Sequence, residues 1–584
     1  MMKNLSFLSD APSYSSSDFF YFLKKVLAKE KKLYWLVIIY GIGISILSLS
    51  IPIAVQYTIG SVTFTGIVKP LVITVTILFL ILIFYVILRA LQIYIIHIFY
   101  KHFFARIVGD IFNSFVLSDY ESFEKRNRTD IANRFFEVVN IQNAFPSILF
   151  GGVSITQQTV VGFVLISFYH FHFMIFSLII VFISYLIFKI KSLSAINNFY
   201  EASNNKYEVI DLLENISRMH KEFKSNHAIE YAKSKVNLGV SNFINNRDLY
   251  FSDLLSQSVS FLALYIFSSC GFLFIGSVLV LKGEITIGQL VAMELIVSTA
   301  LLSLSQFGRY LDNFYELCVA CAKINIFYKI KPEKNMGDIM TSEIAKSDKV
   351  ISMNDVKIKY QDQNFCFDFS IKTSTSNLID VDSNNSRDIF YKLILRFIEP
   401  EAGEIKYYDQ NIEKIDPHSL RDRIYLIDST EIYQCSILEY LTNGVKFSKA
   451  EIQKVLSAVQ LDDVINNLNI DLNSKIIPCG YPFSPTQIIR LKIAKALLYK
   501  PDIIILGTIF DYIEHYRRQY ILKSIKELYP ESTLIHFASV NSKNYDFEYD
   551  GYYFIQKSSV KYFKTLKEFT NFEDEFFIKK INEL

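Results

Sequence analysis

The sequence predicts a two-part membrane protein: a helical half that crosses the bilayer six times, followed by a C-terminal α/β domain. Hydrophobic residues make up 51% of the 584 residues, and the mean hydropathy of +0.26 is high for a soluble chain of this length. The long runs of Ile, Leu, Phe and Val end near residue 305, and from residue 350 short apolar runs alternate with charged ones. We therefore expect a cytoplasmic N-terminal segment at 1–32, a six-helix transmembrane domain with long cytoplasmic loops at 33–330, a linker at 331–349 and an α/β domain at 350–584.

Six segments approach the roughly 20 apolar residues that a helix needs to span a bilayer. They are residues 33–55, 71–96, 154–169, 171–188, 259–281 and 285–304. The third and fourth are short and nearly continuous, so we expect a tight hairpin that turns at His170.

The distribution of Lys and Arg predicts the orientation, because these residues gather on the cytoplasmic side of short loops. Basic residues cluster before the first span, after the second and after the fourth, whereas the loops after the first and fifth spans carry only Lys69 and Lys282. We therefore expect both termini in the cytoplasm. The two long polar loops are helix-like, with little Pro or Gly, so we expect the spanning helices to continue into the cytoplasm.

The N-terminus lacks the order of a cleaved signal peptide, and we expect the first span to target the chain. The stretch DFFYFLKKVLAKEKK before that span predicts an amphipathic helix. Such a helix would either lie on the inner leaflet or serve only as an anchor for the first span.

Charge and cysteine content exclude some classes of partner and site. The formal net charge is only +2, from 60 basic and 58 acidic residues, so no nucleic-acid partner is expected. Cys318 and Cys321 form a C-x-x-C, but no second Cys or His pair follows at zinc spacing. We interpret both as helix core residues with reduced thiols and expect no metal site.

The C-terminal half carries five short apolar runs typical of strands, at residues 350–360, 377–381, 424–428, 502–507 and 533–538. Helical segments separate them, which predicts an α/β domain of roughly 230 residues.

Several stretches resemble the ATP-binding-cassette (ABC) exporter half-transporters, closest to those of type I secretion and bacteriocin export. In the membrane half, YESFEKRNRTDIANR resembles the first intracellular loop of the family, with Thr129 at the usual glycine, and ITIGQLVAM resembles the start of its sixth span. In the soluble half, IEPEAGEI, SLRDRI, SILEYL and IAKALLYKPDIIIL follow family segments in order and spacing. The resemblance implies a P-loop-type ATPase fold for the α/β domain. The 32 residues before the first span are too few for the peptidase domain of some members.

The positions where this family binds phosphate have changed. Counting back from EPEAGEI places the phosphate-binding loop on VDSNNSRD, residues 381–388. Val381 and Ser386 replace the two defining glycines, and Asn384 replaces a third that is common in the family. Arg387 replaces the lysine and Asp388 the magnesium-binding Ser or Thr, so the loop loses backbone freedom and gains a carboxylate beside a polyanion.

The other nucleotide positions have changed as well. Gly507 and Thr508 stand where the family has the magnesium-binding Asp and the catalytic Glu. The signature L-S-G-G-Q reads FSPTQ, which keeps Ser484 and Gln487 but places a proline without an N–H at the first glycine.

The switch histidine aligns with Ser539, His536 lies out of register on a strand, and the Q-loop glutamine falls on Asp428 or Ser429. Tyr360 alone keeps its type, at the position where the family stacks adenine on an aromatic ring.

The sequence therefore predicts an ATP site without catalytic residues, whose degenerate positions are Tyr360, Arg387, Asp388, Ser484 and Gln487. No cofactor is expected, with weak binding of ATP and magnesium as the alternative. The resemblance implies a homodimer or a heterodimer with another half-transporter, in contact with membrane lipid. It also implies a place in the bacterial inner membrane.

Two ionisable residues, Arg89 and Glu294, lie inside predicted spans. In one interpretation the two residues form a pair that faces a substrate path. In the other, Arg89 snorkels to the cytoplasmic interface and Glu294 bonds to neighbouring helices. For the whole chain, three functions remain open. It is a transport subunit for peptide, lipid or other hydrophobic cargo, a non-transporting membrane scaffold or regulator, or a weak nucleotide sensor.

Overall fold

The computed structural model describes residues 16–64, 68–124, 128–333, 337–360, 363–538, 547–557 and 559–582. The chain forms two compact units, Met1–Pro332 and Glu333–Leu584, which are described separately below. The boundary falls within the stretch expected to be a linker.

The first unit is helical. Its longer helices are α1 (Ser16–Leu27), α2 (Lys31–Ser48), α3 (Ser50–Phe64), α4 (Val68–Val116), α7 (Glu137–Ser147), α8 (Ser154–Ser167), α9 (Phe171–Arg218), α10 (Asn226–Leu281), α11 (Ile287–Ser305) and α12 (Phe307–Ile324). Shorter helical segments are η2 (Ala28–Glu30), α5 (Tyr120–Glu124), α6 (Arg128–Asn133), η3 (Arg134–Phe136), the π-turn η4 (Ile148–Val153), η5 (Glu222–Lys224) and η6 (Phe327–Lys329).

Six helical stretches in the first unit are long and apolar enough to cross a membrane, which confirms the predicted number of spans. They are Tyr21–Val62, Val68–Val116, Ile131–Ser167, Phe171–Arg218, Asn226–Leu281 and Ile287–Lys329. At about 1.5 Å per residue, the 48 to 56 residues of α4, α9 and α10 exceed the roughly 30 Å of a hydrocarbon core. The helices therefore continue past the bilayer, as the helix-like loops predicted.

Local sequence decides where the spans break. The first span divides at Leu49, and Pro52 lies in the first turn of α3, where a missing N–H is tolerated. The third span contains Pro146 in α7 and then passes through the π-turn η4 before α8. The predicted hairpin is present, because His170 is extended and its side chain caps α9 by accepting from the His172 N–H.

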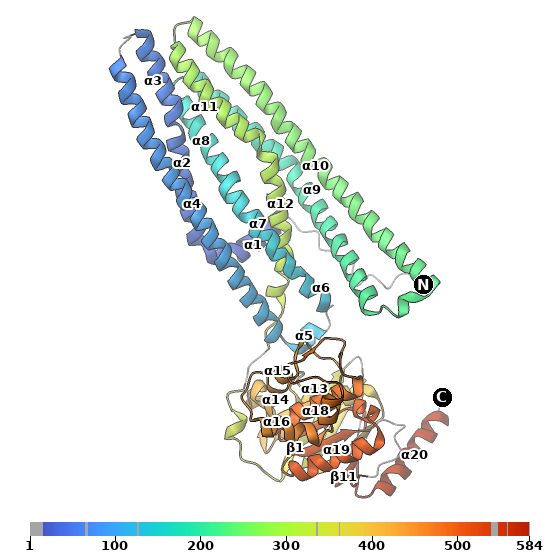
Figure 1. Ribbon diagram of the computed structural model, residues 1–584. Helices are drawn as coiled ribbons and strands as arrows, with labels where there is room; N and C mark the ends of the chain where they lie inside the picture. Colours follow the sequence, from blue (N-terminus) through green and yellow to red (C-terminus); the bar gives the residue numbers. More distant parts are fainter. Residues whose placement is uncertain are drawn as a thin grey trace. The chain divides into compact units, whose positions relative to one another are not determined.

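The spans pack lengthwise in the first unit, with α9 on α10, α2 on α4, and α8 and α3 on α11 (Figure 1). The amphipathic helix α1 packs on α12, and its Phe19 and Val26 are at most 1% exposed. The apolar face of α1 therefore packs against the helical bundle. Cys318 and Cys321 are buried in the same core as free thiols.

The second unit is α/β. Its helices are α13 (Asn384–Ile394), α14 (Pro417–Arg423), α15 (Ile437–Thr442), α16 (Lys449–Ala458), α17 (Asp462–Asn467), α18 (Pro485–Tyr499), α19 (His515–Leu528) and α20 (Leu566–Asn582), with short turns η7 (Thr341–Glu343), η8 (Ile412–Lys414) and η9 (Thr508–Tyr512). Its strands are β1 (Lys349–Tyr360), β2 (Gln363–Lys372), β3 (Ser376–Val381), β4 (Ala402–Tyr407), β5 (Gln410–Asn411), β6 (Ile424–Ile427), β7 (Cys435–Ser436), β8 (Lys475–Ile476), β9 (Ile503–Leu506), β10 (Thr533–Phe537), β11 (Gly551–Gln556) and β12 (Ser559–Phe563).

Two main sheets organise this unit. The larger has the order β12-β11-β3-β10-β9-β6 and is parallel apart from β12, and the smaller, β2-β1-β4-β5, is antiparallel. Strands β3, β9 and β10 are buried along their whole length, which explains the continuous apolar sequence of β9 and the apolar residues at the centres of β3 and β10. Because these strands run parallel, their carboxyl ends meet at one edge of the sheet. Of the residues aligned with the nucleotide positions, those that follow β3, β6 and β9 lie at this edge, whereas Tyr360 ends β1 of the smaller sheet and Ser484 and Gln487 start α18.

Candidate functional site

The connection from β3 to α13 aligns with the loop that binds phosphates in ABC ATPases. Only Asp382 and Ser383 separate strand and helix. Ser383 caps α13 by accepting from the Ser386 N–H, with 3.3 Å between Oγ and N. The buried Ser386 hydroxyl donates to Asp382 Oδ1 at 2.6 Å, and Asp382 Oδ2 accepts from the Lys557 N–H at 3.1 Å. The N-terminus of α13 would otherwise attract a phosphate, but the Ser383 hydroxyl caps it and the Asp382 carboxylate lies beside it.

Arg387 and Asp388 lie in the first turns of α13. The Arg387 guanidinium donates to Thr508 Oγ1 at 3.2 Å and lies 3.5 Å from a carboxylate oxygen of Asp388, a half-exposed side chain. Arg387, which aligns with the family's phosphate-binding lysine, is therefore hydrogen-bonded directly to Thr508, which aligns with the catalytic glutamate.

Gly507 follows β9 closely packed against the neighbouring strand. Its N–H donates to the Ile427 carbonyl at 2.8 Å, and an added Cβ would lie 3.0 Å from that carbonyl oxygen. An aspartate in this conformation would require the backbone of β6 to shift. At the next position, Thr508 has a neutral hydroxyl that cannot polarise a water as a carboxylate does.

Asp428 and Ser429, the two Q-loop candidates, follow β6 at the same edge. Lys492 Nζ donates to Ser429 Oγ at 3.1 Å. Burial raises the pKa of the Asp428 carboxyl, and the positive charge of Lys492 opposes that rise. Burial in turn lowers the pKa of Lys492. This edge therefore holds partly desolvated charges that already have partners.

The two retained signature residues bond to each other. Ser484 is the N-cap of α18 and accepts from the Gln487 N–H, while Gln487 Oε1 accepts from the Ser484 N–H at 2.8 Å. This reciprocal capping box stabilises the helix start. Pro485 occupies the first helical position, which suits a residue without an N–H.

Tyr360 ends β1, beside α13. Its hydroxyl accepts from Lys392 Nζ at 3.1 Å, and the ammonium lies 5.1 Å from the ring centroid.

His536 is buried on β10, between Asp511 Oδ1 at 3.3 Å and the Tyr549 hydroxyl at 2.7 Å. Ser539, the aligned switch position, lies outside the described residues.

Arg89 and Glu294 have separate surroundings in the first unit. The Arg89 guanidinium lies 3.7 Å from the Phe150 ring centroid and donates to Gln92 Oε1. Glu294 Oε1 accepts from the Ser298 hydroxyl at 2.6 Å. In the part of the chain that the structure describes, no ion pair joins Arg89 to Glu294.

An apolar cavity of about 500 Å³ lies in the first unit at the level of the π-turn η4. Side chains from η4, α8, α9 and α12 line it, among them Ile148, Thr156, Phe163, Tyr185, Tyr310 and Phe314. This size falls within the range of small-ligand sites.

Comparison with known proteins shows what the membrane half is. Residues 34–304 match the ABC transporter transmembrane region. Residues 34–304 are an ABC transporter transmembrane region.

Curated relatives of this chain include exporters. It is 25% identical over 295 residues to the lactococcin-G-processing and transport ATP-binding protein LagD of Lactococcus lactis subsp. lactis, covering 49% of this chain and 41% of that protein. It is 23% identical over 274 residues to the alpha-hemolysin translocation ATP-binding protein HlyB of Escherichia coli O157:H7, covering 46% and 38%. The matched stretch is thus less than half the length of either relative.

The fold agrees with the ABC exporters over nearly the whole chain. A bacterial Atm1-family ABC exporter with ATP bound superposes with a TM-score of 0.79 at 13% identity, covering 95% of this chain and 99% of that one. The predicted fold class, a six-span exporter domain followed by an ABC ATPase-like α/β domain, is therefore confirmed.

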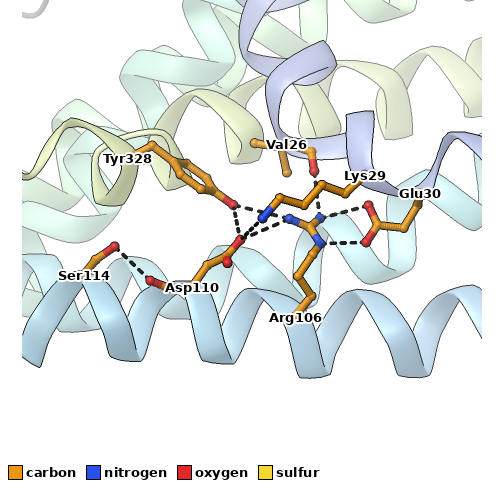
Figure 2. Close-up of polar contacts among 7 residues, drawn as sticks. All are labelled: Val26, Lys29, Glu30, Arg106, Asp110, Ser114 and Tyr328. Carbon is orange, nitrogen blue, oxygen red and sulfur yellow. Dashed lines mark hydrogen bonds and ion pairs between the residues drawn. The ribbon is translucent and has the colours of Figure 1, made fainter. Parts of the chain in front are cut away.

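A polar cluster in the first unit has no counterpart in the sequence predictions (Figure 2). Arg106 of α4 holds both carboxylate oxygens of Glu30, at 2.6 and 3.0 Å, and donates to the Val26 carbonyl at 2.8 Å. Its guanidinium also donates to Asp110 at 3.2 Å, and Asp110 accepts from the Tyr328 hydroxyl at 3.0 Å. We call these five residues the Arg106 cluster. It ties the N-terminal segment and η6 to α4.

The only sequence signal for this cluster is the pair Arg106 and Asp110, which stand at the i, i+4 spacing of helical ion pairs. Glu30 and Tyr328 are distant in sequence and gave no signal.

Proposed function

We propose that the chain is one half of an exporter-type transporter for a peptide, lipid or other hydrophobic cargo, and that its own ATP site is degenerate. The start of α13 carries this proposal. Asp382 and Ser383 bond there to Ser386, at the position where the family's loop wraps the phosphates.

Electrostatics support a weak or lost ATP site. A phosphate at the start of α13 would meet the Asp382 carboxylate, and Arg387 would have to leave Thr508 to reach it. Charge-assisted hydrogen bonds contribute about 1.5 to 3 kcal/mol each, so losing several weakens binding by orders of magnitude. At the end of β9, Gly507 and Thr508 supply no carboxylate for magnesium or water.

The membrane half supports a hydrophobic cargo. The cavity beside η4 is lined almost wholly by apolar and aromatic side chains. The similarity to LagD and HlyB, whose names describe transport of lactococcin G and translocation of alpha-hemolysin, favours a polypeptide among the three cargo classes.

A second chain follows from the family's geometry, in which each ATP lies between the phosphate loop of one cassette and the signature of the other. A homodimer of this chain would have no intact site, so we propose a partner half with an intact phosphate loop. We also propose the orientation and place expected from the Lys and Arg distribution and the family, with both termini cytoplasmic, in a bacterial inner membrane.

Calorimetric titration of the purified full-length chain with ATP, with and without magnesium, tests the degenerate site. We expect no saturable heat at micromolar ATP and no magnesium-dependent turnover. The matched variant Arg387→Ala shows whether any residual millimolar ATP binding depends on the Arg387 guanidinium. Binding that depends on it would be lost in the variant, and binding that does not would remain.

Micromolar affinity in the wild-type chain would overturn the proposed degeneracy. The alternative function, a non-transporting scaffold or regulator, would be favoured instead if the chain forms stable homodimers that neither bind nucleotide nor associate with an exporter half.

A further inference from the structure

A groove of about 830 Å³ runs between the first and second spans of the membrane half. One wall comes from the end of α2 and the start of α3, and the other from about the first four turns of α4. Most of the lining is apolar, including Ile46, Ile53, Ala54, Ile73, Ile77 and Leu78. In the described structure Ile53, Ile73 and Ile77 are about half exposed, so the groove is open toward the surroundings of the bundle.

Polar groups stand at defined places in this groove. Lys69 and Tyr57 line one end. Lys69 is exposed, and among the described residues no carboxylate pairs with it. Midway along the groove Ser50, the first residue of α3, has a buried hydroxyl with no partner within the described ranges. The Lys69 ammonium at one end of the groove and the apolar lining along the rest of it are complementary to an amphipathic anion.

The length of the groove fits one leaflet of a bilayer. Its α4 wall extends from Lys69 to Ile81, about 18 Å at the helical rise of about 1.5 Å per residue. The hydrocarbon core of a bilayer is roughly 30 Å thick, so the groove begins at the end of the span and reaches about the midplane. Its polar end therefore lies at headgroup depth.

We propose that this groove binds one anionic phospholipid of the surrounding bilayer. An acyl chain lies along Ile53 and Ile77, and the phosphate is bound by the Lys69 ammonium and the Tyr57 hydroxyl. The apolar lining at membrane depth and the charge of Lys69, which no carboxylate among the described residues pairs, select a lipid over a protein helix. A helix would have to bring its own carboxylate to that lysine. The site is independent of whether the chain transports cargo.

Native mass spectrometry of the full-length chain tests the site after transfer into nanodiscs of phosphatidylglycerol or of phosphatidylcholine. We expect one retained phosphatidylglycerol per chain and markedly less retained phosphatidylcholine. Lys69→Ala should weaken phosphatidylglycerol retention by at least about tenfold, the effect of losing one charge-assisted hydrogen bond. The matched control Lys282→Ala removes a lysine beyond another span that is also unpaired among the described residues, and it should retain the lipid.

A second pair of variants tests the apolar channel without changing charge. Ala54→Trp fills the groove and should displace the lipid, whereas Val75→Trp adds the same side chain at an exposed position of α4 outside the groove and should not. Normal yield and a monodisperse elution profile show that each variant folds.

Equal retention of the two lipids, or retention of phosphatidylglycerol by both Lys69→Ala and Ala54→Trp, would overturn the proposal. It would also be overturned if Ile73→Cys cross-links two copies of the chain in lipid-free detergent and added phosphatidylglycerol leaves the cross-link unchanged, because a second copy would then occupy the groove. Release of the bound lipid on addition of MgATP would identify it as cargo and would equally contradict a resident lipid.

Discussion

Arg106 has almost no freedom in the membrane half, because its guanidinium contacts groups from the N-terminal segment and from α4 at once. The Arg106 and Glu30 side chains are only 16% and 7% exposed, so each charge depends on the other for solvation. Removing one partner of such a pair leaves a buried charge, which costs more free energy than the pair itself contributes.

We predict that Arg106→Ala destabilises the chain by about 3 kcal/mol, since Glu30 and Asp110 lose their shared cation. The thermal unfolding midpoint in detergent should fall clearly. Lys29→Ala is the control, because Lys29 is 61% exposed and lies 3.5 Å from Asp110, and its loss should cost under about 1 kcal/mol. Similar midpoints for the two variants would show that the Arg106 cluster is not a stabilising centre.

At the residue scale, positions within short motifs are predictable from sequence, whereas contacts between distant positions are not. Each predicted nucleotide position rests on a short contiguous motif and stays a prediction, and the structure places Arg387, Thr508, Asp428 and Ser429 at one sheet edge. Their pairing was not predictable, because Arg387 meets Thr508 across 121 positions of sequence. The same holds for Arg106 and Glu30, which are 76 positions apart.

Among the elements, the π-turn η4 is the least regular part of a span, and a single glycine allows it to pack. A Cβ added to Gly151 would lie 2.0 Å from a ring carbon of Tyr310 on α12. No rotation of the small methyl group relieves such an overlap, so either the ring or the helix must move.

We therefore predict that Gly151→Ala destabilises the membrane half by about 1 to 3 kcal/mol, the usual cost of overpacking. Gly109→Ala in α4 is the matched control, since nothing lies within 4 Å of its added Cβ. That control should be neutral or stabilise the helix by up to about 1 kcal/mol. Thermal unfolding of both variants in the same detergent measures the difference, and an unchanged Gly151→Ala midpoint would contradict the close packing.

The C-terminal helix α20 packs on β11 through Phe554, whose ring lies 5.4 Å from that of Phe572. Nearby, the buried carboxyl groups of Asp380 and Glu573 face each other. Burial, and then the charge of Glu573, raises the pKa of Asp380 to about 8. Asp511 adds a further negative charge.

The sign of the pH effect follows from that shift. Between the ordinary carboxyl pKa of about 4 and a folded value of about 8, the folded state binds more protons than the unfolded state. The stability of this region should therefore decrease as pH rises from 4 to 8.

We predict that amides of α20 lose hydrogen-exchange protection, after correction for intrinsic rates, on going from pH 5 to pH 8.5, and that Asp380→Asn reduces this loss. The amide can still accept from the Val381 N–H, as the carboxyl does at 2.8 Å. Asp348→Asn, at an exposed carboxyl, should behave as the wild-type chain. The same pH response in Asp380→Asn would exclude this carboxyl as its cause.

Element prediction succeeded where hydrophobicity alone decides structure. The six spans were predicted from long apolar runs, and strands β1, β3, β6, β9 and β10 from short runs that contain several Val, Ile or Leu residues. The continuation of the spans into the polar loops was predicted from their lack of Pro and Gly, but the exact ends of α9 and α10 were not, because polar helix and polar loop have the same hydropathy. Strands β2, β4, β11 and β12 are among those not predicted, and of these β2 and β12 lie at sheet edges and are partly exposed.

For the whole molecule, the proposed function makes ATP chemistry depend on a second chain. If this chain pairs with an exporter half whose phosphate loop is intact, that loop would face FSPTQ of this chain. The remaining site would combine the α13 start of this chain with the partner's signature, and it would lack phosphate contacts. Only one of the two composite sites could then turn over.

This asymmetry predicts different effects of two small substitutions in the co-purified pair. Ser484→Ala removes the hydroxyl that would face the partner's ATP and should lower ATP turnover by about tenfold, the effect of one lost hydrogen bond to a charged group. Thr508→Ala lies in the inactive site and should leave turnover unchanged. Because Ser484 also caps α18, its loss should cost about 1 kcal/mol of stability, and turnover is therefore compared well below the unfolding midpoint of both variants. If Thr508→Ala lowered turnover while Ser484→Ala did not, the catalytic site would be the one built on this chain's own α13, and the proposed division of labour would be wrong.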